Sequence, residues 1–89
     1  MTQPLKDRPP GGARVTDYDL AFQRAYLRLL DAAEDPSADW KEAVKLIFGI
    51  DASLEPSRAR TIYDTHLERA RWMTAEGYRD LAGLAPRKS

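Results

Sequence analysis

The stretch PSRARTIYDTHLERARWMTAEG, residues 56–77, decides the fold because its apolar side chains recur at helical spacing. Pro56 suits the first position of a helix and keeps Glu55 out of the helical conformation, and Gly77 is a typical helix terminator. The stretch therefore predicts the longest helix of the chain, which begins at its proline or the serine after it and ends near Glu76. One arc of this helix carries the expected core residues: Ala59, Ile62, Tyr63, His66, Leu67, Ala70 and Met73.

A shorter helix is predicted upstream, in the segment DWKEAVKLIFG at residues 39–49. Asp39 is a residue type that caps helix N-termini, and Glu42 three positions later completes a capping-box variant. Gly49 suits the left-handed residue that closes a helix. The expected buried face of this second helix consists of Trp40, Ala43, Val44, Ile47 and Phe48.

The first helix is predicted from Thr16 or Asp17, either of which can cap it, to about Ala33. Pro36 lies in a polar cluster that ends the helical pattern. The expected core stripe of this helix is Tyr18, Phe22, Ala25, Tyr26, Leu29 and Ala33.

These elements predict an all-α fold, a three to four helix bundle with a helix-turn-helix-like domain over residues 16–84. Two short helices and a longer third fit a helix-turn-helix variant in which the third is the recognition helix. The connector 50–55 is longer than usual, and we expect its Ile50 and Leu54 to tuck under the helices. Tyr78 and Leu81 can form a closing turn or a fourth helix.

Both ends of the chain are expected to be tails. Residues 1–15 are rich in Pro and Gly and contain few large aliphatic side chains, so we expect a disordered N-terminal tail. Residues 85–89 form a basic C-terminal tail. The net charge is +2 for residues 1–14, +2 for residues 85–89 and −4 for residues 15–84, so the expected folded part is acidic although the 89-residue chain is neutral.

Composition and motifs argue against an enzyme or a metalloprotein. The chain has no cysteine, which excludes disulfides, thiolate catalysis and cysteine zinc sites. His66 is the one histidine and falls on the core arc, where a packed, hydrogen-bonded side chain is expected. We expect no cofactor, no membrane span and a cytoplasmic monomer. The carboxylates Asp31, Glu34 and Asp35 are expected to be solvated, and the arginines Arg58, Arg60, Arg69 and Arg71 to be salt-bridged at the surface.

Several apolar side chains fall opposite the predicted core faces. These are Leu20 and Leu27 on the first helix, Leu46 on the second and Trp72 on the third. Four such positions favour a partner-binding surface, since Trp is enriched among residues that dominate binding energy. The alternative is that a short tail or a fourth helix covers some of them. The predicted partner-binding residues are Trp72, Glu68, Thr65, Asp64, Thr61, Arg58, Leu20 and Leu27.

Three segments resemble a family of proteobacterial regulatory domains: RAYLRLL at 24–30, DWKEAVKLIFG at 39–49 and MTAEGYRDL at 73–81. The shared pattern is an aliphatic first helix, an aromatic-basic-Glu start to the second helix, a closing Phe-Gly and a Gly-Tyr-Arg-x-Leu finish. The resemblance extends over about residues 18–82. The chain is thus similar to QseM-like antiactivators, small proteins whose domain is shared with FseA-type and RovC-type transcriptional activators.

The resemblance implies a helix-turn-helix variant that regulates transfer of an integrative and conjugative element under quorum sensing. In this family the antiactivators bind a LuxR-family TraR-type regulator and an FseA-type activator and keep both inactive. DNA-binding members carry a mainly basic outer face on the third helix, but here Asp64, Glu68 and Glu76 interrupt the arginines. Together with the acidic body, this predicts protein binding without specific DNA binding. A small helix-turn-helix DNA-binding regulator is the alternative.

Overall fold

The computed structural model describes residues 4–77, and over this range the chain is all-α without a strand. The elements are α1 (Asp17–Ala21), α2 (Gln23–Glu34), α3 (Trp40–Phe48), α4 (Pro56–Trp72) and the short π-helix η1 (Met73–Gly77). The predicted all-α class is thus confirmed. The predicted closing turn at Tyr78 and Leu81 and the basic tail 85–89 lie outside the described residues.

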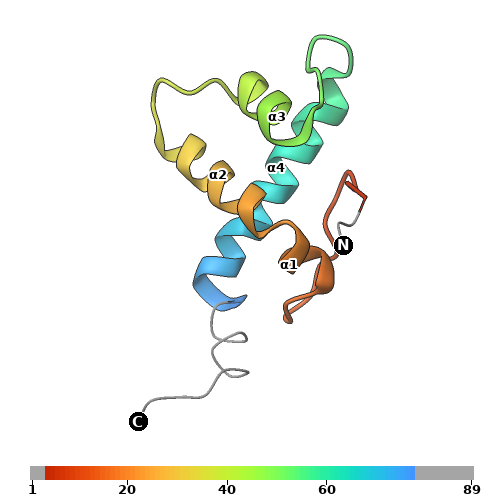
Figure 1. Cartoon of the computed structure of the whole chain (residues 1–89), viewed down its shortest axis with the longest axis vertical. Helices are drawn as coiled ribbons and strands as arrows, with labels where there is room; N and C mark the ends of the chain where they lie inside the picture. Colours follow the sequence, from red (N-terminus) through yellow and green to blue (C-terminus); the bar gives the residue numbers. More distant parts are fainter. Residues whose placement is uncertain (1–3, 78–89) are drawn as a thin grey trace.

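The long helix α4 is the axis on which the other elements pack (Figure 1). In that view α2 and α3 lie on one side of α4, whereas α1 and the N-terminal segment lie on the other. Helices α2, α3 and α4 contact one another pairwise, so they form a trihelical core. The α3–α4 pair, joined by the connector 50–55, is the part that corresponds to the predicted helix-turn-helix unit.

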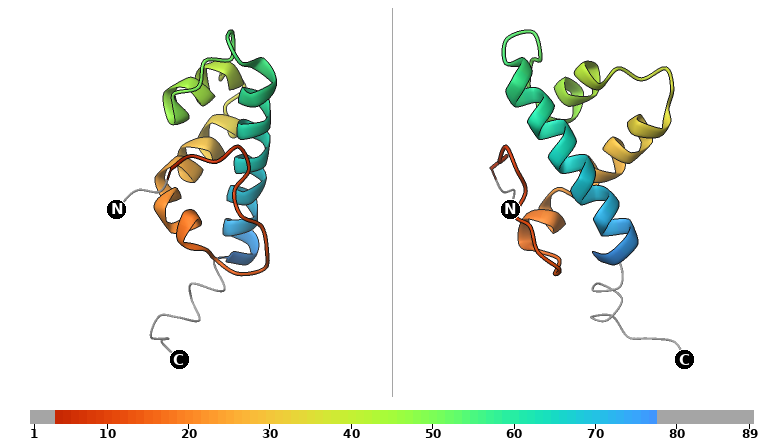
Figure 2. Two further views of the ribbon diagram at one scale, coloured as in Figure 1. Left: turned by 90° about the vertical axis from the view of Figure 1, so that its right-hand side faces the viewer. Right: turned by 180° about the vertical axis from the view of Figure 1, so that it is seen from behind.

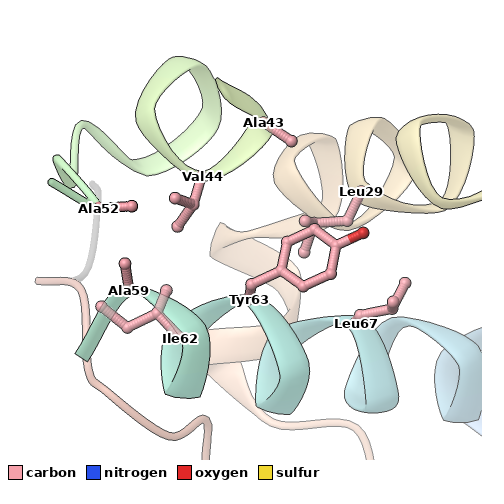
Figure 3. Close-up of a cluster of buried hydrophobic side chains, with 8 residues drawn as sticks. All are labelled: Leu29, Ala43, Val44, Ala52, Ala59, Ile62, Tyr63 and Leu67. Atoms are coloured by element: carbon pink, nitrogen blue, oxygen red, sulfur yellow. The ribbon is translucent and has the colours of Figure 1, made fainter. Parts of the chain in front are cut away.

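The main core fills the space between these three helices (Figure 3). Ile62 and Ala59 of α4, Val44 of α3 and Leu29 of α2 have no exposed surface. Every residue of the predicted arc of α4 is buried, so that prediction is confirmed. Burying one such aliphatic side chain contributes about 1.5–3 kcal/mol, which makes this cluster the main source of stability.

The first predicted helix is wrong in one respect, because the structure breaks it into α1 and α2 at Phe22. Phe22 has φ −105° and ψ 18°, outside the helical region. Its ring stacks on Tyr18 with the centroids 4.2 Å apart and also approaches Phe48 and His66. These tertiary contacts outweigh the local preference for one continuous helix.

The predicted caps Thr16, Asp39 and Gly49 are confirmed, but α3 begins with the Asp39 bond alone and not with the predicted capping box to Glu42. Thr16 and Asp19 form a reciprocal capping box at the start of α1. The Asp39 carboxylate accepts a hydrogen bond from the Lys41 amide at 3.0 Å, and Gly49 closes α3 in the left-handed conformation with φ 74°. A residue with a Cβ at Gly49 would be strained in that conformation.

We predict that Asp39→Ala lowers the free energy of unfolding by about 1 kcal/mol, because the first turn of α3 loses its side-chain acceptor. Urea unfolding followed by circular dichroism measures this loss. Asp31→Ala is the matched control, since it removes an exposed α2 carboxylate that caps no helix and should change stability by less than about 0.5 kcal/mol. Equal losses in both variants would contradict the assigned cap.

The connector 50–55 is only partly buried, in contrast to the prediction. Ile50 packs against the main core as expected. Leu54 is 78% exposed, so the expectation that it tucks under the helices is wrong. The turn before it is closed by polar contacts instead, since Asp51 accepts from both the amide and the hydroxyl of Ser53. An Asx turn of this kind directs the chain outward just before α4 begins.

The N-terminal segment differs from the expected disordered tail. Residues 4–15, which we call the strap, have no regular secondary structure but lie along α4, as the left view of Figure 2 shows. The Asp7 carboxylate pairs with Arg58 at 2.9 Å, and Arg69 donates to the carbonyls of Gly12 and Arg14, both at 2.8 Å. Composition reflects apolar burial alone, whereas donors on α4 bind the backbone of the strap.

Candidate functional site

The outward face of α4, which would be the recognition helix of a DNA-binding domain, has its arginines paired with acids. Arg58 contacts Asp7 at 2.9 Å and Glu55 at 3.2 Å. Arg60 contacts Asp64 at 3.0 Å, and its guanidinium lies 4.8 Å from the centroid of the Trp40 ring. The predicted salt-bridged surface is confirmed for these two arginines. Arg71 is exposed.

Arg69 is the exception. The sequence predicted a surface residue, but Arg69 is only 7% exposed. Its guanidinium forms an ion pair at 2.6 Å with Asp19, whose side chain has no exposed surface. Asp19 also accepts from the Tyr26 hydroxyl at 2.8 Å and the Thr16 amide at 2.9 Å. This network joins α1, α2, α4 and the strap in the interior.

Hydrogen bonding keeps Asp19 ionised. Burial by itself would raise the pKa of Asp19, but the hydrogen bonds from Arg69, the Thr16 amide and Tyr26 outweigh burial and hold this pKa below its usual value. Burial and the bond to Asp19 both raise the pKa of Tyr26, so the phenol remains a donor. The pair is therefore charged and fully hydrogen-bonded at neutral pH.

His66 is a packed core residue, as predicted. It has no exposed surface, and its Nδ1 lies 2.8 Å from the Ile62 carbonyl oxygen. Because a carbonyl oxygen only accepts hydrogen bonds, Nδ1 carries the proton. Nε2 then accepts from the Tyr18 hydroxyl at 2.7 Å, and the Tyr18 oxygen accepts from the Lys6 amide at 3.1 Å. Burial lowers the pKa of His66, so the imidazole is neutral.

The predicted partner-binding residues of α4 are open to solvent only in part: Arg58, Asp64 and Glu68 are exposed, whereas Thr61, Thr65 and Trp72 are half-buried. The strap arches over part of this face and borders an open cavity of about 520 Å³, lined by its residues 8–12 and by Thr65, Glu68, Arg69 and Trp72. Trp72 is half-buried, and the Arg69 guanidinium lies 3.8 Å from its ring centroid. The prediction of a freely exposed Trp72 is therefore wrong, and the alternative that a tail covers this position holds.

The predicted exposed leucines are confirmed. Leu20 is 46%, Leu27 61% and Leu46 65% exposed, and they lie on α1, α2 and α3 respectively. The structure therefore does not gather them on one helix. About half or more of each leucine residue's surface is open to solvent.

Leu27 lies beside an apolar groove that the sequence did not reveal. The groove has a volume of about 300 Å³ between α2 and the C-terminal end of α4. Leu27 and Leu30 form one wall, and Ala70, Met73 and Thr74 form the other. Arg24 and Gln23 supply polar groups at the rim. An apolar groove with a polar rim is suited to a side chain or short helix of another protein.

Metal and carboxylate chemistry have little support in the described part. Within residues 4–77, no group of three or more His, Asp or Glu side chains is placed to hold a metal ion. The carboxylates of Asp31, Glu34 and Asp35 are exposed, in agreement with the predicted solvated cluster. The pKa of Asp35 is lowered by its hydrogen bonds to Ser37, which is opposite to the raised pKa that a general acid requires.

The helical spacing of Asp19 and Arg69 could have indicated that both are buried, although their low hydrophobicity argued against it. Asp19 lies seven positions before Tyr26, and Arg69 lies three after His66 and four before Met73, so both occupy core-side spacings. A charged residue at a core position predicts a buried partner of opposite charge.

Comparison with protein-family models and with curated proteins finds no match to this chain. The resemblance to QseM-like antiactivators therefore stays a prediction. No helix between residues 4 and 77 has the length and apolar character that crossing a membrane demands.

Proposed function

We propose that this protein is an antiactivator that binds transcriptional activators and holds them inactive. The partners are a TraR-type quorum-sensing regulator and an FseA-type activator, and the outcome is repression of transfer of an integrative and conjugative element. It has no enzymatic activity. The observation that carries the proposal is the pairing of α4 arginines with acids at Arg58, Arg60 and Arg69.

The pairing argues against a DNA-binding role for α4. Affinity for duplex DNA comes mainly from Lys and Arg side chains that neutralise phosphates. Arg58 and Arg60 would have to give up their carboxylates to do so, and Arg69 is buried. The acids Asp64 and Glu68 on the same helix would also face the DNA backbone. The outward face of α4 is therefore a poor match for the phosphates of duplex DNA.

The open groove beside Leu27 supports protein binding from the other side of the molecule. Leu27 is 61% exposed and lines an apolar groove, so a partner would remove both from water. The exposure of one leucine is ordinary, but an exposed leucine that extends an apolar groove favours association. We therefore place one activator contact at Leu27.

We predict that Leu27→Asp weakens binding to the FseA-type activator about tenfold, because it puts a charge at the edge of the apolar groove. Isothermal titration calorimetry with the purified activator measures the loss. Leu54→Asp is the matched control, since Leu54 is even more exposed but lies on the connector away from the groove. Unchanged binding by Leu27→Asp, or equal loss in both variants, would contradict this contact.

A gel-shift titration of duplex DNA separates the two candidate functions. An antiactivator should give at most weak, salt-sensitive association near the non-specific range, about micromolar or weaker. A sequence-specific complex tighter than that would favour the DNA-binding regulator. Failure to bind either activator in calorimetry would refute the antiactivator.

A further inference from the structure

The face of α4 that the strap covers, including the buried Arg69, presents hydrogen-bond donors, and the strap presents acceptors. The Arg58 guanidinium donates to the Asp7 carboxylate at 2.9 Å. The Thr65 hydroxyl lies 2.9 Å from the Asp7 carbonyl oxygen and 2.7 Å from the Thr61 carbonyl oxygen of its own helix, so the two acceptors share its one proton. The Arg69 guanidinium donates to the carbonyl oxygens of Gly12 and Arg14, both at 2.8 Å. Apart from the carboxylate, every acceptor is backbone.

The three donor residues form one row along the helix. Arg58, Thr65 and Arg69 are spaced by seven and then four positions, which places them on a single stripe about 16 Å long. Asp7 contacts the start of this row, and Gly12 and Arg14 contact its end. The strap therefore runs in the same direction as α4. Because the row binds backbone carbonyls and one carboxylate, it recognises a segment that is extended and carries one acidic residue. The other side chains of that segment contribute little to this recognition.

The strap does not fill the surface that it covers. The cavity of about 520 Å³ lies between residues 8–12 of the strap and the side chains of Thr65, Glu68 and Trp72. At the centre of the arch, Pro9 and Pro10 have no amide donor, and Gly11 and Gly12 have no side chain. Arg8 and Glu68, which have opposite charges, line the same cavity. The contact thus depends on the two ends of the strap.

We propose that this row, Arg58, Thr65, Arg69 and the adjoining Trp72, is a binding site for an extended, carboxylate-bearing segment of a partner protein. The strap occupies the site within the free protein and must leave before a partner segment enters. The assignment of that partner as an activator rests on the proposed antiactivator function. The site differs from the open groove at Leu27, so the protein has one open and one strap-covered contact surface.

A spin label on the strap tests this proposal in the full chain. The chain has no cysteine, so Gly11→Cys provides a unique labelling position. A Cβ built at Gly11 meets nothing within 4 Å, so the label should not disturb the arch. A nitroxide there should broaden the indole N–H resonance of Trp72. A label at Leu54→Cys, about 25 Å away at the other end of α4, should leave that resonance sharp.

The competitor is a synthetic peptide with the sequence PLKDRPPGGARV, residues 4–15. A tethered segment has an effective concentration on the order of millimolar, so the peptide is titrated from about 0.1 to 20 mM. We expect the Trp72 resonance to sharpen as the peptide displaces the labelled strap. A peptide with Asp7→Ala should need about two- to fivefold more, because it lacks the exposed ion pair with Arg58.

Two results would overturn the proposal. A sharp Trp72 resonance in the free labelled chain would mean that the strap does not occupy the row. Broadening that persists at 20 mM peptide would mean that the row does not accept a segment from another molecule. No activator is present in this experiment, so either failure leaves the antiactivator function to its calorimetric test.

A second measurement adds the activator to the labelled chain. An activator that binds while the Trp72 resonance stays broadened would support the antiactivator function and contradict this site.

Discussion

Replacing Asp19 by Ala is expected to lower the free energy of unfolding by about 3–5 kcal/mol, because it leaves the Arg69 guanidinium buried without its counter-charge. The Tyr26 hydroxyl and the Thr16 amide lose their acceptor in the same variant. Domains of this kind are stable by about 5–15 kcal/mol, so a loss of this size removes a large share of the stability and would partly unfold a domain at the lower end of that range. Urea unfolding followed by circular dichroism gives the free energy.

Two further variants identify the buried charge as the cause. Asp64→Ala breaks the exposed pair with Arg60 and should cost at most about 1 kcal/mol, because solvent screens that pair. The double variant Asp19→Ala, Arg69→Met should be more stable than Asp19→Ala alone, since no uncompensated charge remains in the interior. A double variant that is less stable than the single one would show that the loss comes from packing.

The second large effect is acid destabilisation through His66. Burial lowers the pKa of His66 in the folded chain, whereas the unfolded chain has a pKa of about 6.5. The unfolded state therefore takes up a proton first as the pH falls. The stability that neutral His66 provides is complete above pH 6.5 and is lost as the pH decreases from there to the folded-state pKa. The slope in this window is at most about 1.4 kcal/mol per pH unit.

The hydrogen bonds around His66 explain why the folded state resists protonation. Nδ1 already donates to the Ile62 carbonyl, and Nε2 accepts from the Tyr18 hydroxyl. A proton on Nε2 would turn that acceptor into a donor facing a hydroxyl that already accepts from the Lys6 amide. The charged form would therefore lose the bond from the Tyr18 hydroxyl to Nε2 and leave that hydroxyl proton without its acceptor in the interior.

Urea midpoints measured from pH 7.5 to pH 5 test this prediction. His66 is the one histidine of the chain, so a loss of stability in this range reports on it. His66→Gln should give a flat profile in the same range, although its stability at pH 7 will be lower. Asp19 does not interfere, because its lowered pKa confines its own contribution to a loss below about pH 4. A flat wild-type profile would contradict the assigned neutral state.

The sequence predicted the helices and their buried faces better than the contacts between distant residues. Helical spacing located the core arc from Ala59 of α4 to Met73 of η1, and Asp39 and Gly49 marked the ends of α3. Those features depend on residues within a few positions of one another. The break at Phe22 was missed because it depends on His66 and Phe48, which belong to other helices.

The candidate site was predicted only in part for the same reason. Exposure of Leu20, Leu27 and Leu46 followed from their position opposite the core stripe. The groove beside Leu27 did not, since its second wall comes from Met73 and Thr74 of a segment far along the chain. Trp72 was predicted to be exposed because nothing local to α4 covers it.

By itself the sequence determined an all-α domain, the caps of α1 and α3, the core face of α4 and the acid-paired arginines Arg58 and Arg60. The tertiary structure alone decided that Asp19 and Arg69, 50 positions apart, are paired in the interior and that the strap covers Trp72. Helical spacing puts each of these two residues on a core-facing side, but it does not identify which opposite charge is its partner. A buried charge is stable only when a distant partner and several donors compensate for its desolvation, and only the folded chain brings them together.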